Sequence, residues 1–159
     1  MTPSNYQSDV LDEADNGYPS HRPNFTPGSE HASKRVRTVA KILIIDDEPR
    51  FRRVLRLALG ASGHVIQEMA NGSDALNLMQ TEIPDLVLLD WQMAGLDGLQ
   101  TCRAIRAKSD VPIIMVTSKP DGRSQALASG ATDYLTKPFS VDDLLERIES
   151  ALSRPRSAR

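Results

Sequence analysis

The residues of this sequence that could do chemistry are polar side chains placed at or just after short apolar runs. They are Asp46 and Asp47 after the run 41–45, Asp90 after 86–89, Thr117 after 113–116, and Lys137 shortly after 132–135. If these runs are strands of one parallel sheet, their carboxyl ends meet at one edge and bring the polar groups together. Three carboxylates at one edge repel one another unless a cation neutralises them. A site with only a few oxygen ligands from the protein favours Mg²⁺, which keeps several water ligands and often completes its coordination shell with a phosphate.

Each of these residues has an ordinary explanation when it is considered alone. Asp46 and Asp47 could be a helix N-cap pair, and Asp90 could be a turn residue that ends a strand. A single Thr117 or Lys137 in such a place indicates nothing. The ordinary explanations leave open why acids, a hydroxyl and an ammonium all fall at the same edge, so the set as a whole favours a functional site.

The pattern of apolar residues predicts the elements that position these side chains. The run 41–45, KILII, is continuously apolar after its lysine, which is typical of a strand covered on both faces. Strands are predicted at 41–45, 65–69, 86–89, 113–116 and 132–135, and helices from Pro49 and over 74–80, 99–107, 122–128 and 140–152. This alternation predicts an α/β fold with a doubly wound, five-stranded parallel sheet, helices on both faces and right-handed crossovers.

Helix faces and ends are predicted from spacing and capping residues. In the first helix we expect Phe51, Val54, Leu55 and Ala58 to face the sheet, and Arg50, Arg52, Arg53 and Arg56 to face away. The arginine face could dock an acidic or phosphorylated donor, and a plain solvated face explains it equally well. Gly60 and Gly63 are expected to end that helix. Ser73 is the expected N-cap of the second helix, and Ser140 opens the last one with a capping-box pattern.

Composition limits the function and the location. With 159 residues, of which 40% are hydrophobic and 25% charged, the chain has the make-up of a soluble globular protein. A formal net charge of −2 gives no reason to expect nucleic acid as the main ligand. No apolar run is long enough to span a bilayer, and no signal-peptide pattern opens the chain, so we expect a cytoplasmic protein with no membrane attachment.

Three regions are expected along the chain. Residues 1–38 are rich in polar residues, proline and glycine without apolar periodicity, which predicts a disordered N-terminal extension. Residues 39–153 carry the whole α/β pattern and predict one domain. Residues 154–159 are predicted to be a disordered basic tail.

Several motifs, in the right order, resemble those of bacterial response-regulator receiver domains of the CheY-like kind. They are IIDDEP at 44–49, PDLVLLD at 84–90, Met93 with Asp97-Gly98, PIIMVT at 112–117 and GATDYLTKPF at 130–139. The resemblance covers about residues 41–152. It implies the flavodoxin-like (βα)5 receiver fold, and it also implies a cis peptide bond before Pro138.

The resemblance also implies a function and a role for each site residue. Asp90 would accept a phosphoryl group from a phosphohistidine donor, on a sensor histidine kinase or a histidine phosphotransfer protein. Asp46, Asp47, Asp90 and the backbone carbonyl of Gln92 would hold Mg²⁺, Thr117 and Lys137 would contact the phosphoryl group, and Thr117 and Tyr134 would form the switch. The surface of helix 4, strand 5 and helix 5 would then control a downstream protein. Such a protein is an autocatalytic phosphoacceptor rather than a turnover enzyme, binds no nucleic acid directly, and is a monomer or a phosphorylation-dependent homodimer.

Some features depart from the family pattern. Ala94 stands where the family commonly has proline, and the segment from Thr117 to Lys137 is about two residues short, which predicts a truncated fourth helix. Gln92 and Lys119 flank the phosphoacceptor and, as a hypothesis, set how fast water reaches the acyl phosphate.

Four alternative functions remain. The chain could be the receiver part of a DNA-binding transcriptional regulator, or a degenerate receiver that only binds partners, against which the complete set of site residues argues. A haloacid-dehalogenase-like aspartyl-phosphate phosphatase is expected to carry its second aspartate two residues after the first, where this chain has Glu48. An FMN-binding flavodoxin-like protein needs a phosphate loop after the first strand, and the acids there would repel the phosphate.

Overall fold

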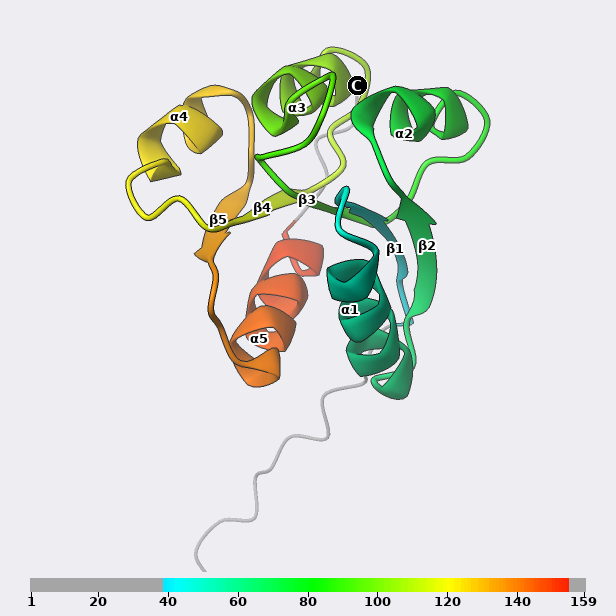
Figure 1. The fold of residues 1–159 in the computed structure, drawn as a ribbon. Coiled ribbons are helices and arrows are strands. Elements are labelled where there is room, and N and C mark those ends of the chain that lie inside the picture. Colours follow the sequence, from blue (N-terminus) through cyan, green and yellow to red (C-terminus); the bar gives the residue numbers. More distant parts are fainter. Residues whose placement is uncertain (1–38, 155–159) are drawn as a thin grey trace, which may run out of the picture. The chain divides into compact units, whose positions relative to one another are not determined.

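The predicted alternation of strands and helices is present in the computed structural model of the protein, which describes residues 39–154 (Figure 1). The strands are β1 (Lys41–Ile45), β2 (Val65–Met69), β3 (Leu86–Leu89), β4 (Ile113–Thr117) and β5 (Asp133–Thr136). The helices are α1 (Pro49–Ala61), α2 (Gly72–Leu78), α3 (Gly98–Arg106), α4 (Arg123–Ala128) and α5 (Val141–Leu152). The segments predicted to be disordered, 1–38 and 154–159, lie outside the described residues except for Arg154. The domain boundaries therefore stay a prediction.

The five strands form one parallel sheet in the order β2-β1-β3-β4-β5. Ile45, the last residue of β1, is in register with Met69 of β2 and Leu89 of β3. The strand order changes direction between β1 and β3, and ligands of open α/β sheets bind at such a point, outside the carboxyl ends of the strands. The topology thus confirms the doubly wound sheet and places Asp46, Asp47 and Asp90 on neighbouring strand ends.

Helices cover both faces of the sheet. Figure 1 shows α1 and α5 on one face and α2, α3 and α4 on the other. Ile42, Ile44 and Leu88 pack under α1 and α5, whereas Leu43, Ile45 and Leu89 belong to the opposite core. Because successive side chains of a strand point to opposite faces, a strand buried on both faces must be apolar throughout. None of the described helices is long and apolar enough to cross a membrane.

The buried residues of α1 are not all the ones that were predicted. Leu55 and Leu59 are buried and Phe51 is partly buried, but Val54 is 58% exposed. Phe51, Leu55 and Leu59 repeat every four positions, so the buried face of the helix is narrower than predicted. Val54, next to Leu55 in the sequence, lies outside this face. The expectation that Arg52 faces away is also wrong, because its side chain is only 16% exposed.

The helix ends agree with the prediction in part. Asn71, not Ser73, caps α2, since the Asn71 side chain accepts a hydrogen bond from the backbone N–H of Asp74 at 2.8 Å. The expected helix 74–80 therefore begins and ends two residues earlier. Ser140 caps α5 with the predicted capping box. Helix α1 continues through Gly60 to Ala61, and the positive φ of Gly63 (89°) follows its end.

Candidate functional site

Three carboxylates from two strand ends converge at the switch point of the sheet. One carboxylate oxygen from each of Asp46, Asp47 and Asp90 lies within 4.8 Å of the others. Asp46 and Asp90 are buried, at 2% and 8% exposure, whereas Asp47 is exposed. The spacing suits one shared cation, and an exposed ligand leaves room for its waters.

The carboxylate of Asp46 is held from two sides. Its Oδ1 accepts the backbone N–H of Glu48 at 2.8 Å, and its Oδ2 accepts the ammonium of Lys137 at 3.1 Å. Helix α1 has Glu48 as its N-cap residue, with no side-chain cap. The interpretation of the Asp46-Asp47 pair as a plain helix N-cap is therefore excluded.

Lys137 reaches the acids from the end of β5. Its Nζ lies 3.9 Å from Oδ1 of Asp90 and 3.7 Å from the centroid of the Phe51 ring, in addition to its bond with Asp46. The Lys137–Pro138 peptide bond is cis, as expected from the resemblance. One ammonium therefore stands between two buried carboxylates and offsets part of their mutual repulsion.

The environment of Asp90 disfavours its charge. Desolvation by burial raises the pKa of Asp90 to about 6; the Lys137 ammonium opposes this rise and the Asp46 carboxylate adds to it. The backbone N–H groups of Trp91 and Gln92 also lower this pKa, and Trp91 N lies 2.8 Å from Asp90 Oδ1. A cation bound by the three acids would favour the ionised carboxylate, which is the nucleophilic form.

The predicted switch residues lie on β4 and β5. Thr117 is completely buried, and its hydroxyl oxygen accepts the backbone N–H of Lys119 at 3.4 Å. Tyr134 is 4% exposed, donates its O–H to the carbonyl of Lys119, and packs edge-on against the Trp91 ring with centroids 6.5 Å apart. Gln92 lies two residues after Asp90 with an exposed side chain.

Sequence reasoning missed several residues that shape this site. A Cβ on Gly98 would lie 2.1 Å from the carbonyl oxygen of Asp90, and one on Gly122 would lie 2.3 Å from the Trp91 ring. Arg52 donates to the backbone carbonyl of Asp46 at 2.6 Å. Close approach between distant segments leaves no periodic signal, although Asp97-Gly98 did stand out as a motif.

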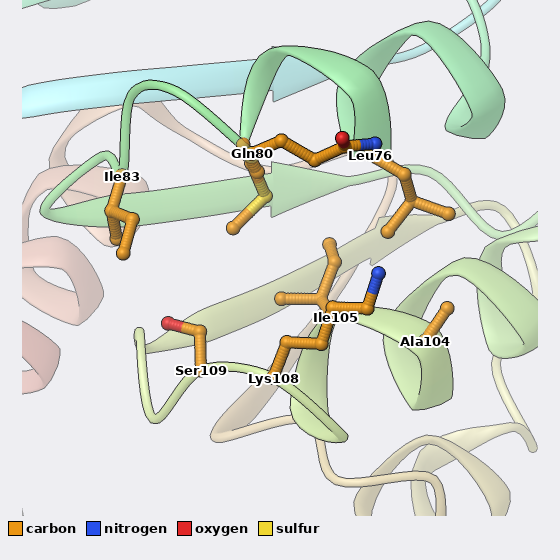
Figure 2. Close-up of a pocket in the computed structure, with 8 residues that line it drawn as sticks. Leu76, Gln80, Ile83, Ala104, Ile105, Lys108 and Ser109 are labelled. Atoms are coloured by element: carbon orange, nitrogen blue, oxygen red, sulfur yellow. The ribbon is translucent and has the colours of Figure 1, made fainter.

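The apolar crevice in Figure 2 is separate from these residues. It has a volume of about 60 Å³ and lies between α2 and α3. Its lining includes Leu76, Met79, Ile83, Ile105 and Lys108, and none of the predicted site residues. It therefore has no part in the chemistry of the acid cluster.

The family model described as "Response regulator receiver domain" matches residues 42–149. The chain belongs to this family. It is 43% identical over 125 residues to the "Probable transcriptional regulator ycf27" of Guillardia theta, covering 77% of this chain and 49% of that protein. It is 42% identical over 116 residues to the "Transcriptional regulatory protein ResD" of Bacillus subtilis, covering 72% of this chain and 48% of that protein.

The receiver domain is also similar to solved structures. The response regulator TrrA of Thermotoga maritima, solved in complex with Mg(2+)-BeF, superposes with a TM-score of 0.66 at 36% identity, covering 70% of this chain and 97% of that one. The chain spans about half the length of the curated relatives that it matches. The matched family is the receiver family, and not the haloacid-dehalogenase-like or FMN-binding families that were considered as alternatives.

Proposed function

We propose that this receiver domain takes a phosphoryl group from a phosphohistidine donor onto Asp90, in a cytoplasmic, Mg²⁺-dependent reaction. The observation that supports this most directly is the cluster of Asp46, Asp47 and Asp90, whose oxygens lie within 4.8 Å, with Lys137 beside it. The donor is a sensor histidine kinase or a histidine phosphotransfer protein. The domain is a phosphoacceptor that helps its own modification and is not a turnover enzyme.

The residues present fit a magnesium ion. The donor set is all oxygen, two of its members are buried, and the two carboxylates that face Lys137 are only partly neutralised by it. Asp46, Asp47, Asp90 and the carbonyl of Gln92 would hold the ion. When bound, Mg²⁺ supplies positive charge that balances the incoming phosphoryl oxygens.

Asp90 is the nucleophile in this proposal. One of its carboxylate oxygens attacks phosphorus while the bond from phosphorus to the imidazole nitrogen of the donor breaks, and the electron pair leaves with that nitrogen. The Trp91 N–H holds the carboxylate through Oδ1 and sets its plane. Lys137 and Thr117 then take phosphoryl oxygens as partners, which suits a reaction that needs positioning and charge neutralisation more than acid-base chemistry.

The signal then passes to the surface of α4, β5 and α5. A phosphoryl group adds nearly two negative charges and three strong acceptors, which draw Thr117 and its loop toward Asp90. Tyr134 donates to the carbonyl of Lys119 in that same loop, so a movement of the loop reaches β5. This surface controls a downstream protein, with the domain as a monomer or a phosphorylation-dependent homodimer.

Intact-mass measurement tests the proposal directly. The wild type, incubated with acetyl phosphate and MgCl₂, is expected to gain the mass of one phosphoryl group and to gain none with EDTA. Asp90→Ala is expected to gain none, whereas Asp142→Ala, which removes an exposed carboxylate of α5, is the matched control and should label fully. Equal labelling of Asp90→Ala and wild type would contradict the assignment.

A second candidate is that the domain controls an attached DNA-binding part. The relatives named as transcriptional regulators are about twice the matched length, and direct DNA binding would then belong to that other part. An immunoblot of the source cells tests this. A species well above 17.5 kDa supports it, and a species of 17.5 kDa contradicts it.

A further inference from the structure

The peptide unit that joins the first two acids is held by a side chain of α1. Nη1 of Arg52 donates to the backbone carbonyl of Asp46 at 2.6 Å. That carbonyl belongs to the peptide bond between Asp46 and Asp47. The orientation of this peptide plane therefore sets the direction in which the Asp47 side chain points. Asp47 is exposed, and its Oδ2 has a bond with the backbone N–H of Ala94 at 3.2 Å.

Arg52 is itself anchored. Its Nε lies 3.7 Å from Oε2 of Glu68 on β2, and Arg56 pairs with the other oxygen of Glu68 at 2.9 Å. The Arg52 side chain is mostly buried, whereas that of Arg56 is about half exposed. A charged donor on a neutral carbonyl makes a short, directional bond. The buried Nε of Arg52 has no hydrogen-bond partner among the described residues, so Glu68 holds the guanidinium by the attraction of opposite charges alone.

We propose that Arg52, anchored by Glu68, is a positioning residue that holds the Asp46–Asp47 peptide in the orientation that binds Mg²⁺. This inference rests on the proposed function, since it concerns the ion required there. Arg52 is not a ligand and touches no phosphoryl group. It acts through the two acids, as groups that orient metal ligands do.

The sign of the effect separates positioning from simple electrostatics. Arg52 carries a positive charge close to a cation site, so Coulomb repulsion alone predicts that its removal strengthens Mg²⁺ binding. A positioning role predicts the opposite, because a freed peptide must be ordered when the ion binds. Loss of an orienting partner typically weakens metal binding by about tenfold or more.

Isothermal titration of the full chain with MgCl₂ tests the proposal. Arg52→Gln is expected to raise the Mg²⁺ dissociation constant by about tenfold. Labelling by acetyl phosphate at saturating Mg²⁺ should stay close to that of the wild type. Arg56→Gln is the matched control, because it also removes a cation that pairs with Glu68 but has no bond to Asp46. Its dissociation constant should stay within about twofold, as for other half-exposed ion pairs.

The outcomes are distinct. An unchanged or smaller dissociation constant for Arg52→Gln overturns the inference, as does an equal loss in Arg56→Gln. If Arg52→Gln is unfolded at the assay temperature, Arg52→Lys keeps the positive charge and a donor nitrogen but loses the planar guanidinium, and a rise of about threefold is expected instead. No rise in the lysine variant also overturns it. If the wild type neither binds Mg²⁺ nor is phosphorylated by acetyl phosphate, the proposed function itself is overturned. If the wild type does both, a result for the Arg52 variants bears on the role of Arg52 alone.

Discussion

The two halves of the strand-end site are held in different ways. On the acid half, formed by β1 and β3, Asp46 is fixed through its backbone N–H, its carbonyl and both carboxylate oxygens. The partners are Met69 of β2, Arg52 of α1, Glu48 just before α1 and Lys137 just after β5. On the switch half, formed by β4 and β5, the Thr117 hydroxyl has a 3.4 Å bond with a residue two positions along the chain. The side chain of Tyr134 is held by one hydrogen bond, to the Lys119 carbonyl, and by packing on Trp91, while its backbone N–H and carbonyl are bonded to Asp133 and Arg123.

This difference matches the proposed division of labour. An ion site must keep its ligands in place before the ion arrives, so several directional bonds to distant elements suit it. A switch must have a second arrangement that differs by only a few kcal/mol, so few directional bonds suit it. The helices agree, since α1 has 13 residues and α4, which follows the switch loop, has six.

The largest expected effect comes from breaking the ion pairs of the acid half. Lys137→Met leaves Asp46 and Asp90 buried without their ammonium, which should lower the free energy of unfolding of the metal-free domain by about 3–5 kcal/mol. MgCl₂ should restore part of the loss, because the cation replaces the lost charge. Urea unfolding with and without Mg²⁺ measures both. Lys108→Met, at an exposed position of the α3 end, is the control, and an equal loss there would contradict the account.

The second effect is a gain in stability. The folded pKa of Asp90, about 6, lies above its ordinary value of 3.8, so the charged form costs stability above pH 6 and this cost disappears as the pH falls below 4. Asp90→Asn should therefore stabilise the metal-free domain at pH 8 by about 3 kcal/mol, since one pKa unit corresponds to about 1.4 kcal/mol.

This gain in stability should shrink as the pH is lowered through 6, because the wild-type Asp90 carboxyl is then protonated and is neutral, like the asparagine side chain. Thermal unfolding of both proteins from pH 8 to pH 5 in EDTA measures the difference. A gain that is constant across this range would show that burial of Asp90 is not its cause.

The third test moves to the switch half. A Cβ on Gly122 would lie 2.3 Å from the Trp91 ring and 2.7 Å from the Tyr134 hydroxyl, so Gly122→Ala forces one ring to shift. Overpacking of this kind should cost about 1.5 kcal/mol and change the fluorescence of Trp91, the only tryptophan of the chain. Gly60→Ala in α1 is the matched control, because its Cβ would meet nothing within 4 Å, and it should stabilise the helix by roughly 0.5–1 kcal/mol.

The smallest expected effect is that of Tyr134→Phe, and it tests most directly whether the acid half and the switch half are independent. Tyr134→Phe removes only the O–H donated to the Lys119 carbonyl, which should cost about 1 kcal/mol. Because the Tyr134 hydroxyl bonds to Lys119 and to none of the three acids, and the Phe ring can still pack on Trp91, the Mg²⁺ dissociation constant should not change. Thermal unfolding and MgCl₂ titration of the same sample measure the two quantities. A weaker affinity for Mg²⁺ would show that the two halves are coupled before phosphorylation.

Much of the site could be predicted because each acid directly follows an apolar strand. Asp46, Asp47 and Asp90 needed only the rule that parallel strands end at one edge, and the structure brings them together. The capping box at Ser140 and the short α4 were also predictable, because each depends on a short stretch of consecutive residues. The cap of α2 was assigned to Ser73 because serine and asparagine are both good caps, and sequence alone does not choose between neighbouring candidates.

The sequence by itself determined the strands, the helices, the two-sided burial of the sheet and the group of acids at its edge. These features follow from local spacing, because side chains repeat every two residues in a strand and about every 3.6 in a helix. Only the tertiary structure decided that Arg52 reaches the Asp46 carbonyl, that Val54 faces solvent, and that Gly122 makes room for Trp91. Such contacts join segments far apart in the chain, so they depend on how the helices pack on the sheet and have no local pattern.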